Sequence, residues 1–326
     1  MAFEPTPRQF VSRKASQELL ASIGQLPGQP GDGFFGPGSV TWRVNRESAV
    51  FLGAGRAALL QLAHPWVAVA LAQHSNLLHD PVGRFHSTFR VIYTMLFGTR
   101  GQATEASKQL YRLHTGIRGE LPHPVGDYPS GDHYEANEVA ALRWVYATLV
   151  ESAILAYEFA LPPLTLSDRE QYYTESKRMA ALFGISADAL PRDWTAFSRY
   201  TATMVDSPQL CVDANALALG KSVLSGVGTR LRPPHWYGAL TAYWMPQPLR
   251  AAFQLDFGTR EEQAVHRAAR WLPRIYPYLP ATVRFVGPFH EANARLRGQA
   301  PGALTRRSNR FWMGQPRLLY SRLSAD

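Results

Sequence analysis

Apolar residues recur at three- and four-residue spacing along most of this chain, with few alternating runs. That spacing is typical of amphipathic helices, whereas strict alternation is typical of strands. From Val44 onward the pattern therefore predicts a nearly all-helical protein. The first 40 residues differ, because a short helical stretch at residues 14–23 is followed by the glycine- and proline-rich loop LPGQPGDGFFGPG. The predicted fold class is all-α, a globular bundle of many helices.

Five long helices are predicted between residues 47 and 183. The first begins near Glu47 or Gly53 and continues to about His74, with a kink at Pro65, since proline removes a helical hydrogen bond. The others are predicted at residues 84–97, 103–117, 136–159 and 168–183, the last preceded by Ser167 and with acids in its first turn. Gly98 and Gly119 are expected to end the second and third helices.

No internal repeat and no low-complexity linker divides the chain. We therefore expect an N-terminal extension at residues 1–40, one helical domain at 41–300 and a basic tail at 301–326. A chain of 326 residues buries roughly three quarters of its unfolded surface. Such a core is large enough to enclose a cofactor.

The formal net charge is +9, from 34 lysines and arginines against 25 acids. Most arginines are scattered, which is typical of a solvated surface. Five of them gather between Thr305 and Arg322, among Phe311, Trp312 and Tyr320. A basic and aromatic tail is compatible with nucleic acid or an anionic membrane. It matches no binding motif, so no nucleic-acid partner is predicted, and the oligomeric state stays open.

Cys211 is the single cysteine, which excludes an intrachain disulfide and a multi-cysteine metal site. The longest uncharged run, residues 57–79, carries three histidines, two glutamines and an asparagine. That composition favours a buried helix over a membrane span. The first ten residues are polar with two prolines, unlike a signal peptide. A cytoplasmic protein without a transmembrane span is the expectation.

Two groups of motifs point away from common enzyme classes. Gly53, Gly55 and Ala58 follow an apolar triplet as in a dinucleotide fingerprint, but that motif needs a strand before it and an acid about twenty positions on. Small residues that let helices pack closely are the better interpretation. The chain also lacks a G-x-S-x-G elbow, an H-E-x-x-H motif and a P-loop.

The informative residues are histidines, six of which fall between His64 and His123. His114 is predicted on an apolar helix face together with Ala103, Ala106, Leu110, Leu113 and Ile117. A histidine there is either a hydrogen-bonded core residue or a ligand. The same alternatives apply to His64, which precedes Pro65 and would otherwise cap freed carbonyls.

Arg84 and Thr88 are spaced i, i+4, about 6 Å apart along one helix face. Inward-facing groups of this kind are costly unless something anionic or polar meets them. An arginine that reaches solvent is the alternative. Together, Arg84, Thr88 and His114 on consecutive helices would suit haem b, whose iron takes a neutral imidazole, whose propionates take arginine and whose ring takes apolar walls.

Four segments carry these residues in a characteristic order: GAGRAALLQLAHPWVAVALAQHS, DPVGRFHSTFRVIYTMLFGT, YRLHTGIRG and WVYATLVES. They resemble the haem-dependent oxygenases typified by latex clearing protein and MpaB. The resemblance covers residues 44–184, with a weaker echo at 279–288. It implies an all-α fold with one haem b (iron), His114 as the proximal iron ligand, and Arg84 and Thr88 lining the haem pocket. His64, in the first segment, is a further candidate for cofactor contact.

The sequence departs from the rubber-cleaving members at three places. Ser87 stands where they have a lysine, the segment VAVALAQ lacks their upstream glutamate, and Tyr146 replaces a histidine. These departures bear on rubber cleavage and not on haem binding. The prediction is an oxygenase that acts on an apolar or unsaturated small molecule, with O2 bound opposite His114. A non-enzymatic haem carrier or sensor, and a purely structural helical protein, are the alternatives.

Overall fold

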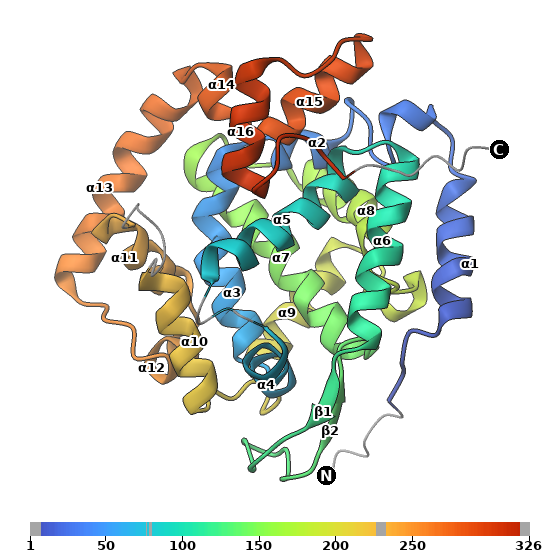
Figure 1. Cartoon of the computed structure of the whole chain (residues 1–326). Helices are drawn as coiled ribbons and strands as arrows, with labels where there is room; N and C mark the ends of the chain where they lie inside the picture. The colour runs from blue at the N-terminus through green and yellow to red at the C-terminus, as the bar shows by residue number, and fades with distance from the viewer. Residues whose placement is uncertain (1–7, 76, 78–79, 226–232, 320–326) are drawn as a thin grey trace.

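The computed structural model describes residues 8–75, 77, 80–225 and 233–319 (Figure 1). The N-terminal half contains α1 (Arg13–Gly24), α2 (Val40–Asn45), α3 (Ala54–Leu62), α4 (Pro65–His74), α5 (Pro81–Phe97), α6 (Arg100–Thr115) and α7 (Val139–Ala160). The C-terminal half contains α8 (Leu166–Leu182), α9 (Trp194–Val205), α10 (Ala214–Ser225), α11 (His235–Trp244), α12 (Gln247–Ala252), α13 (Thr259–Ile275), α14 (Ala281–Arg284), α15 (Gly287–Leu296) and α16 (Ala303–Met313). Short 3-10 helices are η1 (Pro30–Asp32), η2 (Ser48–Gly53), η3 (Ala187–Ala189) and η4 (Tyr276–Tyr278). The all-α prediction is confirmed.

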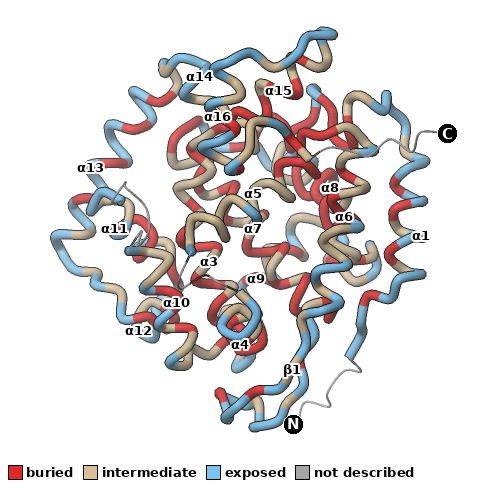
Figure 2. Tube along the Cα trace, in the orientation of Figure 1, coloured by how far each residue is buried: buried red, intermediate tan, exposed pale blue. Residues whose placement is uncertain are grey.

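Helix α7 runs through the middle of the molecule and packs against η2, α2, α3, α8, α9 and α13. Figure 2 shows buried positions concentrated along it and its neighbours. Trp144 on α7 donates its indole N–H to the Leu60 carbonyl of α3 (2.8 Å). Within the described ranges, α7 is the one helix long and apolar enough to cross a membrane, yet 61% of its most apolar window is buried inside the fold. Such burial is expected of a core helix.

The long first helix that the sequence predicts is in fact three elements, η2, α3 and α4. Helix α3 ends at Leu62, and His64 is extended, with φ −83° and ψ 118°. The residue before a proline is disfavoured in the helical region, and proline itself suits the first position of a helix. Pro65 therefore starts a new helix, and the prediction of a kinked continuous one was wrong.

Helices α5 and α6 form where predicted but begin three residues earlier. Asp80 caps α5 by accepting from the Gly83 N–H (2.8 Å), and Thr99 forms a capping box with Gln102 at the start of α6. Gly98 ends α5 as predicted, although its φ is −71°. A glycine is needed there because a Cβ would lie 2.4 Å from the Thr94 carbonyl oxygen.

The end of α6 differs from the prediction. The helix stops at Thr115, so Ile117 lies beyond it, and Leu113 is 59% exposed instead of sharing the buried face. Gly119 does not end a helix. It lies in the strand β1 (Arg118–Glu120), which pairs antiparallel with β2 (His133–Glu135). Strands of three residues are too short to show an alternating pattern.

The glycine-rich stretch at residues 53–58 packs helices together, as expected. A Cβ on Gly53 would lie 2.4 Å from the Ser152 carbonyl of α7, and one on Gly55 would lie 2.7 Å from Thr241 Oγ1 of α11. The segment before it is the 3-10 helix η2, with no strand. The reading as close helix packing, and not as a dinucleotide motif, is confirmed.

The basic segment after residue 300 also contributes to the core. Helix α16 packs against α5 and α15. Trp312 stacks on Phe51 at 4.1 Å between ring centroids, and Arg90 of α5 donates to the Met313 carbonyl (3.3 Å). The C-terminal helix therefore helps to hold α5, which carries two of the predicted site residues.

Candidate functional site

Helices α5 and α6 are consecutive in the sequence and are joined by a tight turn at Gly98 and Thr99. The two helices also pack against each other. Figure 1 shows them leaving this turn in different directions in front of α7. Arg84 and Thr88 lie in the first turns of α5, and His114 lies in the last turn of α6. The candidate residues thus lie at the ends of α5 and α6 that are remote from the turn between these helices.

His114 is held as a neutral imidazole. Burial lowers its pKa from the ordinary value of 6.5 to about 4, and the nearby Arg84 cation lowers the pKa further in the same direction. No hydrogen bond joins the His114 ring to another described residue. A neutral ring close to a cation, with no partner in the part of the chain that is described, has a nitrogen lone pair available at physiological pH.

Arg84 is a partly buried cation. Its Nη1 donates to Thr88 Oγ1 (3.0 Å), and Thr88 Oγ1 donates back to the Arg84 carbonyl (3.0 Å). Burial lowers the Arg84 pKa. No carboxylate pairs with Arg84 among the described residues. An Arg84–carboxylate ion pair would have favoured a purely structural role for this arginine. Most of its five N–H donors make no hydrogen bond to a described residue and can therefore meet an anionic group.

His64 occupies a different place, at the junction of α3 and α4. The residue is 3% exposed, and its ring contacts those of Trp66 (5.5 Å) and Tyr128 (5.9 Å). Its side chain makes no capping hydrogen bond to α4, and Nδ1 has no partner among the described residues. The structure therefore joins Arg84 to Thr88 by a hydrogen bond and places the Arg84 cation near enough to His114 to lower its pKa, whereas His64 lies in other contacts. The cofactor roles of all four residues stay predictions.

His64 makes the protein sensitive to acid. Burial lowers its pKa from 6.5 to about 4, so between these values the unfolded chain takes up a proton that the folded chain does not. Stability is then lost as the pH falls from about 6.5 towards 4. Urea unfolding at both ends of this window should show that His64→Gln loses about 3 kcal/mol less than the wild type. Parallel losses in the two proteins would contradict the assignment.

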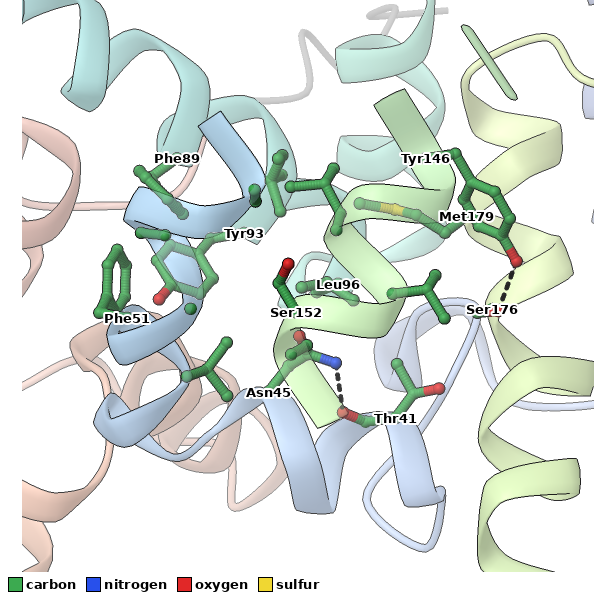
Figure 3. Close-up of a pocket in the computed structure, with 18 of the residues that line it drawn as sticks. Thr41, Asn45, Phe51, Phe89, Tyr93, Leu96, Tyr146, Ser152, Ser176 and Met179 are labelled. Carbon is green, nitrogen blue, oxygen red and sulfur yellow. Dashed lines mark hydrogen bonds between the residues drawn. The ribbon is translucent and has the colours of Figure 1, made fainter. Parts of the chain in front are cut away.

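An apolar cavity of about 100 Å³ lies beside these residues, between α2, η2, α3, α5, α7 and α8 (Figure 3). Its lining residues are Thr41, Asn45, Val50, Phe51, Gly53, Ala54, Ala57, Phe89, Ile92, Tyr93, Leu96, Tyr146, Leu149, Val150, Ser152, Ala153, Tyr172, Ser176, Met179 and Phe183. Ile92 and Leu96 continue at four-residue steps the face of α5 that begins with Arg84 and Thr88. One face of α5 thus changes from polar at its start to apolar along the cavity.

Comparison with known proteins places this arrangement in a family. The family described as ER-bound oxygenase mpaB/B'/rubber oxygenase, catalytic domain, matches residues 42–275. The chain belongs to this oxygenase family. The match contains α5, α6 and α7 and every lining residue of the cavity except Thr41, and it confirms the resemblance identified in the sequence.

Two relatives are uncharacterized proteins, Mb2261 of Mycobacterium bovis and Rv2237 of Mycobacterium tuberculosis. Each is 23% identical to this chain over 221 residues, which is 66% of this chain and 82% of the relative. No solved structure matches the chain significantly. The mpaB and rubber oxygenase family therefore supplies the general class of function, and the relatives add no substrate.

Two departures from the rubber-cleaving members have clear places in this oxygenase. Ser87 is exposed, and its hydroxyl donates to the Gly83 carbonyl (2.8 Å) instead of facing His114. Tyr146 is buried in the cavity wall, where its hydroxyl pairs with Ser176 (2.6 Å). Tyr93 and Ser152, which also line the cavity, were missed by the sequence analysis. A single polar residue on an otherwise apolar helix face was the signal that could have found Tyr93.

Proposed function

We propose that this protein is a haem b-dependent oxygenase that acts on an apolar or unsaturated small molecule. The proposal is carried by a neutral His114 in the electrostatic field of Arg84, a cation without a carboxylate partner in the described structure, and by an apolar cavity lined by the same helix α5. Membership of the mpaB and rubber oxygenase family supports the oxygenase class.

The residues present fit haem on three counts. Haem iron is ligated by an unprotonated imidazole, and the lowered pKa of His114 keeps its ring in that form. Propionates ask for a cation, and Arg84 has free N–H donors. The flat ring asks for apolar walls, which Phe89, Ile92 and Leu149 supply nearby. Within the described ranges no three His, Cys, Asp or Glu side chains gather to hold a bare metal ion.

Each residue then has a role. His114 would ligate the iron, Arg84 would bind a propionate, and Thr88 would orient the guanidinium through its hydroxyl. The apolar lining would exclude water and hold the hydrocarbon part of the substrate. When bound, haem would supply the chemistry of O2 activation that amino-acid side chains lack.

A non-enzymatic haem carrier or sensor is the second candidate. The position of Ser87 favours it, because this residue is turned to the surface and offers no amine towards His114. Such a protein would bind haem without turning over a substrate. Tyr146, engaged with Ser176, likewise offers no free acid or base.

The test is to express the chain with haem supply and to measure its absorption spectrum and iron content. A Soret band with equimolar iron is expected, followed by O2 uptake coupled to a product that carries isotopically labelled oxygen from the gas. A colourless, iron-free folded protein would overturn the proposal. Haem without O2 uptake across a panel of terpenes and unsaturated fatty esters would decide for the carrier.

A further inference from the structure

The cavity between α5, α7 and α8 is built mainly from aromatic and aliphatic side chains, but several polar groups reach its wall (Figure 3). Most of these are occupied. Tyr146 pairs with Ser176 (2.6 Å), and Asn45 donates to the Thr41 carbonyl (2.9 Å) and to the Tyr172 hydroxyl (3.2 Å). These hydrogen bonds are internal to the protein, so the groups that make them need no partner from a ligand.

The hydroxyls of Ser152 and Thr41 also lie at the cavity wall. Ser152 Oγ accepts from Arg56 Nη1 (2.9 Å), so it serves to anchor a buried cation. Thr41 Oγ1 has no partner among the described residues, but this atom is completely enclosed by protein, so a ligand cannot reach it. Neither hydroxyl is suited to select what enters the cavity.

Tyr93 is different. The residue is 4% exposed, lines the cavity, and its hydroxyl makes no hydrogen bond to any described residue. The rings of Phe51 (6.3 Å) and Phe89 (5.7 Å) pack against it, as Figure 3 shows, and Phe97 stacks on it (5.9 Å). Burial raises the pKa of Tyr93 well above its ordinary value, which keeps the phenol protonated as a donor. A rigidly held donor thus stands in an apolar cavity.

We propose that this cavity binds an apolar molecule that carries an acceptor oxygen, a ketone, ether or alcohol, and that the oxygen accepts a hydrogen bond from the Tyr93 hydroxyl. A buried polar group without a partner costs free energy, so a ligand oxygen that satisfies it gains affinity, whereas a pure hydrocarbon leaves the phenol unpaired. The role of this molecule as the substrate of the oxygenase rests on the proposed function. The binding itself does not.

The position of the cavity suits a substrate. Phe89 directly follows Thr88 on α5 and Ile92 lies one turn beyond it, and both line the cavity, yet Arg84, Thr88 and His114 are not part of its wall. The ligand would therefore lie beside the group that His114 and Arg84 hold, and the two would bind together. Tyr93 would set which end of the molecule points away from that group.

The test compares acetophenone with ethylbenzene, two aromatic probes of similar size of which only the first has an acceptor oxygen. Calorimetric titration should show acetophenone binding about tenfold more tightly to the wild type. Tyr93→Phe should remove this preference. Tyr134→Phe, on the hairpin away from the cavity, should keep it. Ala153→Leu, which fills the cavity, should weaken both probes, and circular dichroism checks that each variant is folded.

Equal affinity for the two probes in the wild type, or an unchanged preference in Tyr93→Phe, would overturn the inference. So would loss of acetophenone binding once the protein is loaded with haem, because haem would then occupy the cavity itself. A protein that forms no Soret band but still binds acetophenone through Tyr93 would refute the proposed function and leave the binding site standing.

Discussion

His114→Ala should lose the Soret band and nearly all bound iron after expression with haem supply. The substitution removes an imidazole that burial and the Arg84 cation keep neutral. Because the pKa of His114 is about 4, the wild type should hold its spectrum unchanged from pH 8 to about pH 6, well above the range in which the ring is protonated. Absorption spectra of the purified proteins measure both effects.

His74→Ala is the matched control. His74 lies exposed at the end of α4, where its Nε2 is 3.1 Å from the Tyr134 hydroxyl, and it does not line the cavity. This variant should keep the wild-type spectrum. If the wild type and both variants give equal spectra, His114 is not the iron ligand.

The order of the helices could be predicted because their apolar spacing is local information. The apolar spacing within residues 84–97 was sufficient to place Arg84 and Thr88 on the same side of α5. The motifs around these two residues identified the family. The break before Pro65 could also have been foreseen, since the residue preceding a proline resists the helical conformation. The prediction followed the periodic spacing of apolar residues across Pro65 and therefore gave one kinked helix instead of two helices.

The cavity could not be predicted, because its walls come from helices that are far apart in the chain. Thr41 on α2, Leu149 on α7 and Met179 on α8 meet only after packing. For the same reason the exposure of Leu113 and the pairing of Tyr146 with Ser176 had no local signal. The sequence therefore supplied the candidates Arg84, Thr88 and His114, whereas the cavity depends on how the helices pack.

Glu47→Ala should destabilise the protein by about 3–5 kcal/mol, because it leaves the partly buried Arg284 cation without its carboxylate partner. Glu47 is 1% exposed and receives two hydrogen bonds from the Arg284 guanidinium (both 2.8 Å) and one from the Tyr276 hydroxyl (3.1 Å). The carboxylate raises the pKa of Arg284. These bonds tie the start of η2, whose Val50 and Phe51 line the cavity, to η4 and α14.

Urea unfolding followed by circular dichroism measures the loss, with Glu18→Ala as the control. Glu18 faces only Lys14 at 3.9 Å on the exposed side of α1, and pairs of that kind contribute little. If the stranded charge causes the loss, Glu47→Ala with Arg284→Ala should be more stable than Glu47→Ala alone. A double variant less stable than the single one would mean that the contacts of the Arg284 side chain matter more than its unpaired charge. The cavity wall would then be held by packing and not by this ion pair.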